Sequence, residues 1–225
     1  MNAALLGFLL PTLIVGIGVS STADARTNDA RVSVIGHSVI IHTEIVVYGK
    51  NATAAEASAV RENILKNWQS DSYGNSWTFL EKRSGVRYEV FFDVTVSLYY
   101  GLEKQQPQII PGAWNPMNRR NYINLSEVPV RSNVYAGDEG RWYPGHPNTY
   151  AHEFGHLLGL TDRYHVSKDG YSDSDRGWES NLMADSTYGR VEQRNIDAIV
   201  RPIVLRRLLT NADFKTEIDN PFMLR

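Results

Sequence analysis

Cysteine is absent from this chain of 225 residues. Its absence excludes disulfide bonds, metal sites built from thiolates and catalysis by a cysteine nucleophile. It does not by itself identify a cellular compartment. If the protein is secreted, side-chain packing and a bound metal must supply the stability that disulfides would otherwise give.

A strong charge of one sign is also lacking. The formal net charge is −2, and 21% of the residues are charged. This balance gives no reason to expect nucleic acid or an anionic membrane surface as a partner. The length and the 42% of hydrophobic residues suit one globular domain with an ordinary core. No feature of the sequence demands oligomerisation, so we expect a monomer.

The N-terminal segment has the composition of a targeting sequence. Residues 3–19 are almost wholly apolar, and residues 23–25 read Ala-Asp-Ala, which has the small-residue pattern of a cleavage site. We therefore expect residues 1–25 to be a secretory signal peptide and residues 26–225 to be the secreted protein. Because no lysine or arginine precedes the apolar run, a membrane anchor through residues 3–19 is the alternative, although this run is short for a bilayer span.

Periodicity in the remaining chain predicts a mixed α/β (α+β) fold. An alternating run from Val86 to Tyr100 predicts a long central strand, and residues 32–48 are also strand-like. Thr53 and Glu56 form a capping-box pattern, which predicts a helix with one apolar face against the sheet. Further elements are expected as short strands at 122–125 and 128–135, a loop at 137–147 and a helix at 191–200.

Two prolines set expected boundaries. Pro129 has no N–H group to donate, so it restricts the strand at 128–135 to the edge of a sheet. Pro202 should end or kink the last helix. Residues 163–189 are polar with little periodicity, which indicates a small irregular region before that terminal helix.

The segment from Thr149 to Tyr164 carries the most specific pattern in the chain, His152-Glu153-x-x-His156. On a helix, two histidines four residues apart project from one face, so both imidazoles can bind one Zn²⁺. Glu153 lies beside the first histidine, where its carboxylate can reach a metal-bound water and act as general base and acid. On the pentapeptide alone, an amphipathic helix with two surface histidines is the alternative.

Two residues after the pentapeptide extend the pattern. Gly159 comes three residues after His156, where glycine permits the positive φ of a helix end. Asp162 follows that turn and can supply a carboxylate oxygen as the third ligand. His165 is a rival for this third position.

With these residues the chain resembles the metzincin zinc peptidases. Their extended motif, H-E-x-x-H-x-x-G-x-x-H or D, is followed by a turn that contains a methionine beneath the metal. An aspartate as third ligand is similar to the snapalysin-type minority of the family. The matching residues here are His152, Glu153, His156, Gly159 and Asp162, with Met183 in Asn181-Leu182-Met183-Ala184.

The resemblance implies a metzincin-like zincin fold with a mixed twisted sheet, a backing helix and an active-site helix. An upper lobe would cover about residues 26–160, and a small irregular C-terminal lobe with a terminal helix about residues 161–225. It also implies an extended peptide substrate along an edge strand within Val128–Tyr135. The implied site has one catalytic Zn²⁺ on His152, His156 and Asp162, Glu153 as the catalytic residue and Met183 in a structural role.

We therefore expect a secreted zinc endopeptidase that acts on a protein or peptide substrate. A proteolytic toxin or effector of narrow specificity on the same core is one alternative. A non-catalytic metal-binding module is another, but the presence of Glu153 argues against it because a structural zinc site needs no base.

Weaker signals lie elsewhere. Tyr188 could assist an oxyanion, although packing is the expected role, and Trp142 could line the rim of a cleft or pack in the core. A cluster of oxygen-bearing residues could bind Ca²⁺ or form an exposed polar loop, namely Asp169, Gly170, Asp173 and Asp175.

Overall fold

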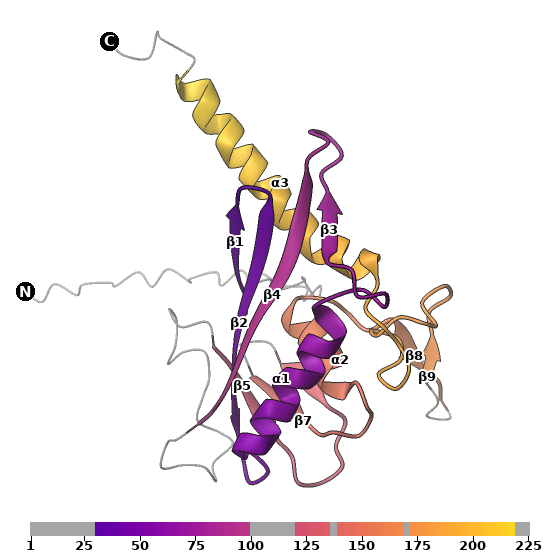
Figure 1. Ribbon diagram of the computed structural model, residues 1–225. Helices are drawn as coiled ribbons and strands as arrows, with labels where there is room; N and C mark the ends of the chain where they lie inside the picture. The colour runs from indigo at the N-terminus through magenta and orange to yellow at the C-terminus, as the bar shows by residue number, and fades with distance from the viewer. Residues whose placement is uncertain (1–29, 100–119, 136–138, 169–171, 219–225) are drawn as a thin grey trace, which may run out of the picture.

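The computed structural model describes residues 30–99, 120–135, 139–168 and 172–218 of the chain (Figure 1). The expected signal peptide or anchor lies outside these residues, as do Asp169 and Gly170 of the candidate calcium loop. In the described part of the chain, no helix is both long enough and apolar enough to cross a membrane.

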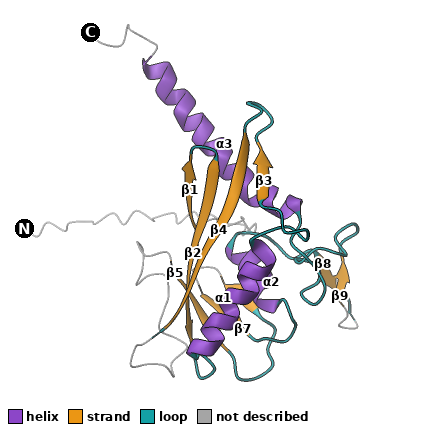
Figure 2. Cartoon of the chain, viewed as in Figure 1, coloured by secondary structure: helices purple, strands orange, loops and turns teal. Residues whose placement is uncertain are grey.

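A mixed sheet of seven strands and three helices make up the described fold, with a separate small hairpin. The sheet order is β3-β4-β2-β5-β7-β6. Strand β1 pairs with the first half of β2, on the same edge where β5 pairs with the second half. The hairpin lies apart from the large sheet (Figure 2). The strands are β1 (Arg31–Ile35), β2 (Ser38–Tyr48), β3 (Trp77–Leu80), β4 (Arg87–Leu98), β5 (Arg120–Leu125), β6 (Asn133–Tyr135), β7 (Glu139–Trp142) and, in the hairpin, β8 (Tyr164–Val166) and β9 (Ser172–Ser174). The helices are α1 (Ala54–Trp68), α2 (Thr149–Leu157) and α3 (Gln193–Ile218).

Strand β4 confirms the alternation predicted for residues 86–100. It lies between β3 and β2, so it is an interior strand of the sheet. Its buried side chains are Tyr88, Val90, Phe92 and Val94, and the side chains between them are exposed. One face of β4 therefore belongs to the core, against which α1 packs.

The strand expected at residues 32–48 is instead two strands. Gly36 adopts a φ of 55°, and the chain reverses there to form the antiparallel pair of β1 and β2. A positive φ is readily adopted by glycine, and this turn interrupts a stretch that is strand-like in the sequence on both sides.

The region expected as a loop at 137–147 contains strand β7. This strand pairs in parallel with β5 and in antiparallel with β6. Its charged residues and Gly140 hide it from pattern analysis, yet glycine suits this position because a Cβ there would lie 2.9 Å from the backbone carbonyl oxygen of Asn133. Only Asn133–Tyr135 of the strand expected at 128–135 is a strand, and it occupies the edge as predicted.

The helix after Thr53 is confirmed, whereas the last helix does not end at Pro202, which was one of the two effects expected of this proline. The Glu56 N–H donates to Thr53 Oγ1 at 3.1 Å, which caps α1 as the sequence predicts. Helix α3 continues through Pro202 to Ile218. Pro202 is exposed, so its ring meets solvent, and the apolar spacing resumes at the buried Val204.

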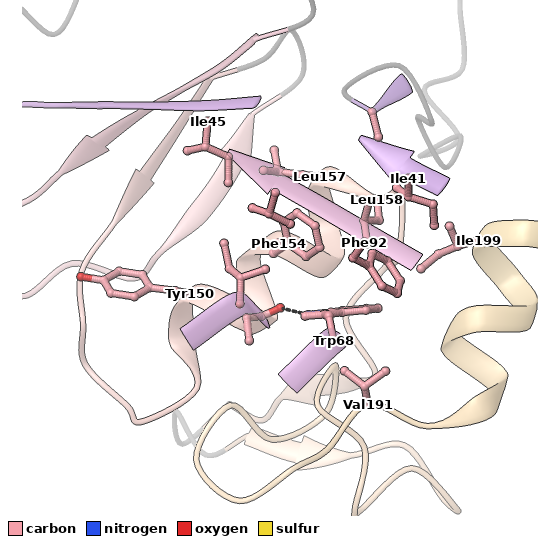
Figure 3. Packing of buried hydrophobic residues seen from close by; sticks show 14 of the residues in the cluster. Ile41, Ile45, Trp68, Phe92, Tyr150, Phe154, Leu157, Leu158, Val191 and Ile199 are labelled. Carbon is pink, nitrogen blue, oxygen red and sulfur yellow. Dashed lines mark hydrogen bonds between the residues drawn. The ribbon is translucent and has the colours of Figure 1, made fainter. Parts of the chain in front are cut away.

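Trp68, the last residue of α1, joins the sheet to α2 (Figure 3). Its indole N–H donates to the Ala151 carbonyl of α2 at 2.9 Å. Its ring makes edge-to-face contacts with Phe92 of β4 and Phe154 of α2, at centroid distances of 5.5 and 5.7 Å. The side chain is fully buried, so the position of α2 depends on this residue.

We expect Trp68→Ala to lower the free energy of unfolding by about 3–5 kcal/mol, since it leaves a large cavity between α1, β4 and α2. Denaturant-induced unfolding measures this change. As a control, Tyr73→Ala at a residue that is 88% exposed should change the same quantity by no more than about 0.5 kcal/mol. Equal effects of the two substitutions would contradict the role given to Trp68.

Candidate metal centre

Side chains of α1 hold the start of α2. Asn63 Nδ2 donates to the Pro147 carbonyl at 2.6 Å, and Asn63 Oδ1 accepts the Ala151 N–H at 3.0 Å. The Tyr150 hydroxyl also donates to Glu56 Oε1, at 2.5 Å. The first N–H groups of a helix have no partner within it, so these contacts satisfy one of them and fix the direction of α2.

The end of α2 returns the chain toward its own histidines. Gly159 has a φ of 87°, which confirms the predicted turn. The Gly159 N–H bonds to the His156 carbonyl and the Leu160 N–H to the Gly155 carbonyl, both at 2.9 Å. After this tight end the chain passes back beside α2 and brings Asp162 to the histidines.

His152, His156 and Asp162 converge on one point. Asp162 Oδ1 lies 3.1 Å from His152 Nε2 and 3.2 Å from His156 Nε2. One candidate ligand atom from each residue falls within 4.8 Å of the others, so the three could hold a metal ion. His165 is not part of this group, because its Nε2 faces Asp173 at 3.9 Å in the β8–β9 hairpin.

The other ring nitrogens of the two histidines are fixed by backbone carbonyls. His152 Nδ1 lies 2.8 Å from the Leu182 carbonyl, and His156 Nδ1 lies 2.8 Å from the Leu160 carbonyl. A carbonyl only accepts, so each Nδ1 carries the hydrogen and each Nε2 presents a lone pair in the neutral ring. This is the arrangement expected of metal-binding histidines, and the donor set of two imidazoles and a carboxylate fits zinc.

The charges of the cluster are coupled. Burial alone lowers the pKa of His156, but the hydrogen bond to Asp162 and the charge of Glu153 outweigh it and raise that pKa. Burial alone raises the pKa of Asp162, but the hydrogen bonds from His152 and His156 hold it well below its usual range. A metal cation between these three side chains would take the place of the contacts that the two Nε2 atoms make with Asp162 Oδ1.

Glu153 is a buried carboxylate with one oxygen that lacks a hydrogen-bond partner among the described residues. Its side chain is 4% exposed, and none of the described residues gives its Oε2 a hydrogen bond. Burial raises its pKa, and the opposing effect of His156 and His152 does not cancel this shift. A buried unsatisfied carboxylate costs stability, so its position next to His152 points to a chemical role.

Met183 packs directly under α2. A Cβ built on Gly155 would lie 2.4 Å from Met183 Sδ, so only glycine leaves room for the methionine at this point of the helix. The turn around Met183 is fixed because its N–H donates to Asn181 Oδ1 at 2.9 Å, while Asn181 Nδ2 donates to Asn195 Oδ1 at 2.7 Å. The same turn supplies the Leu182 carbonyl that orients His152.

The structure adds residues that sequence analysis missed. Tyr164 lies with its ring centroid 6.3 Å from that of His152, and its hydroxyl accepts a hydrogen bond from Arg131 Nη2 at 2.6 Å. Arg131 Nη2 also lies 3.9 Å from Asp162 Oδ2. Neither residue is part of a recognisable sequence motif, and Arg131 reaches the site from a segment that is remote in the sequence. Gly155 could have been noticed as a glycine inside a predicted helix.

Two weaker expectations are settled by burial. Trp142 is fully buried and packs near Tyr150, at a centroid distance of 5.9 Å, so the cleft-rim alternative is wrong. Tyr188 is 83% exposed, so the packing role expected for it is wrong.

Among the described residues, His152, His156 and Asp162 form the one group of three or more His, Asp or Glu side chains that could hold a metal ion.

We expect zinc affinity to fall as the pH drops, and the decline to begin above pH 6.5, the ordinary imidazole value, because zinc must displace a proton from His156. Competition with a chelator over a pH series measures this. In Asp162→Asn, which lacks the carboxylate that raises the pKa of His156, the decline should begin at lower pH. The affinity of that variant at high pH should be weaker by about 100-fold or more. An affinity that does not change on acidification would contradict this assignment.

Comparison with known proteins gives no family. No protein-family model matches the chain, and no curated protein matches it. What the structure supports directly is a mixed α/β fold with a cluster of two histidines and an aspartate that could bind a metal ion.

Proposed function

We propose that the protein is a zinc-dependent endopeptidase in which His152, His156 and Asp162 hold the metal and Glu153 is the general base and acid. The observation that carries the proposal is the buried Glu153 carboxylate, whose Oε2 has no hydrogen-bond partner among the described residues. A structural zinc site is usually closed by four protein ligands and has no use for such a carboxylate, whereas a catalytic site keeps three ligands and an open position.

The proposed mechanism divides the work between the metal and the side chains. A bound zinc ion would supply Lewis-acid polarisation of a water molecule and of the scissile carbonyl. Glu153 takes the proton from the attacking water and then gives it to the leaving amine. Burial raises the pKa of Glu153, which favours the first half of this transfer because the carboxylate is then a stronger base than an exposed one.

The histidines contribute by being held in the correct orientation. The Leu182 and Leu160 carbonyls keep a hydrogen on each Nδ1, so neither ring can present the wrong nitrogen. The anionic Asp162 completes the set. Since these three side chains are positioned by one helix, its terminal turn and the Met183 turn, the site is preorganised by the fold.

The proposed substrate is an extended peptide that adds to the edge of the sheet. β6 is the last strand in the sheet order and pairs with β7 alone among the described strands. An extended peptide can take backbone hydrogen bonds from such an edge, and pockets beside it then select side chains. We further propose that residues 1–25 direct secretion, so that the substrate is met outside the cell.

We expect Glu153→Gln to retain zinc and to lose about 100- to 10,000-fold in kcat/KM for peptide cleavage, because the amide cannot accept the proton. Cleavage of casein and of a peptide library, with zinc content measured on the same samples, tests this. A matched control is Glu89→Gln, which changes an exposed side chain of β4 and should leave cleavage unchanged.

Two results would contradict the proposed function. One is zinc binding without any cleavage by the unmodified protein, which would leave a metal-binding module. The other is cleavage that persists in Glu153→Gln, or in the presence of a zinc chelator.

A further inference from the structure

Arg131 places a cation beside the candidate metal centre from outside the metal-binding motif. Its Nη2 donates to the Tyr164 hydroxyl at 2.6 Å and lies 3.9 Å from Asp162 Oδ2. Its guanidinium carbon also lies 5.5 Å from the centroid of the Tyr164 ring. These contacts hold the end of a long side chain next to the cluster, although Asp162 already has both histidines as closer partners.

The Arg131 guanidinium is held in place, but most of its N–H donors have no acceptor among the described residues. The Arg131 side chain is 66% exposed, and Tyr164 is the only hydrogen-bond acceptor that the described residues offer it. An arginine has five N–H donors in a planar fork, stays charged at any working pH and binds carboxylates in a bidentate manner. Most of its donors therefore point to solvent beside the cluster and can bind an anionic group of a ligand.

The neighbouring arginine is engaged elsewhere. Arg163 follows Asp162 in sequence, but its guanidinium carbon lies 4.4 Å from the centroid of the Trp178 ring. Arg194 lies on the same ring at 4.1 Å. These two cations are part of a packed structure around Trp178, so of these three described arginines Arg131 is the one with donors available at the metal centre.

The backbone next to Arg131 is tied to the end of β7, the partner of the edge strand β6. Ser132 Oγ donates to the Tyr143 carbonyl at 3.1 Å and accepts the Tyr143 N–H at 2.9 Å. Strand β6 begins at Asn133, two residues after Arg131. A peptide that lay along this edge and reached the metal centre would therefore pass the guanidinium.

From these contacts we infer that Arg131 is a specificity determinant, which selects substrates with a carboxylate side chain within a few residues of the scissile bond. This inference rests on the proposed peptidase function. A divalent cation together with Asp162, Glu153 and Arg131 leaves the centre with a net positive formal charge, which complements an acidic substrate. Because Tyr164 already restrains the Arg131 side chain, that side chain loses less conformational entropy when it binds a carboxylate.

The test measures binding separately from cleavage. Zinc-loaded Glu153→Ala protein is titrated with fluorescein-labelled peptides that differ in a single residue, Glu, Gln or Lys, placed in turn at each position of one neutral sequence. At one or two positions we expect the Glu peptide to bind about tenfold more tightly than the Gln peptide. Addition of Arg131→Gln should abolish this difference, and Arg131→Glu should reverse it in favour of the Lys peptide.

A matched control changes the same charge at a distant place. Arg201 is exposed on α3, which packs on β3 at the opposite end of the sheet order from β6. Arg201→Glu should therefore keep the preference for the Glu peptide. Zinc affinity, measured on every variant, should change less than about threefold in Arg131→Gln, because Arg131 is not a ligand.

The outcomes separate this inference from the proposed function. Equal binding of the Glu and Gln peptides, including no binding of either, would overturn the role of Arg131 whatever the cleavage assays show. Loss of zinc in Arg131→Gln, with equal weakening of all peptides, would also overturn it and make Arg131 a positioning residue for Asp162. If the preference for the Glu peptide depends on Arg131 but Glu153-dependent cleavage is absent, the peptidase function fails and the acidic-peptide site stands.

Discussion

The candidate centre depends on two hydrogen bonds from imidazole rings to backbone carbonyls. His152 Nδ1 bonds to the Leu182 carbonyl and His156 Nδ1 to the Leu160 carbonyl, both at 2.8 Å. Each carbonyl fixes a tautomer and a ring direction, and without them two histidines on a helix would be free to turn away from each other. The Leu160 carbonyl comes from the turn that ends α2 and the Leu182 carbonyl from the turn around Met183, so two loops must fold correctly before the centre exists.

The rest of the fold can be understood as support for α2. Trp68 holds it through the Ala151 carbonyl and Phe154, and Met183 packs against Gly155 close to the Trp68 ring. This support allows the helix to carry a buried carboxylate whose Oε2 has no hydrogen-bond partner among the described residues. Glu153 is thus a local cost in stability that the surrounding packing offsets, as is usual where a site is kept ready for chemistry.

The sequence predicted the elements whose signal is local. The capped helix after Thr53, the alternation of β4 and the turn at Gly159 each follow from a short stretch of sequence, and all three are present. Strand β7 is defined by its pairing with β5 and β6, and helix α3 runs on through Pro202, so sequence patterns misjudged both. The cluster of His152, His156 and Asp162 could be predicted because all its members lie within one helix and its turn. Arg131 could not, since only the three-dimensional fold brings it to Asp162.

The central claim is that zinc binds to His152, His156 and Asp162 while Glu153 stays uncoordinated. A crystal structure of the zinc-loaded protein, with anomalous diffraction data collected at the zinc edge, tests it most directly. The predicted result is one zinc ion bonded to the two Nε2 atoms and an Asp162 oxygen at about 2.0–2.2 Å, with the Glu153 carboxylate nearby but unbound. Zinc coordinated by Glu153 or His165, or absent from this cluster in a fully loaded protein, would contradict it.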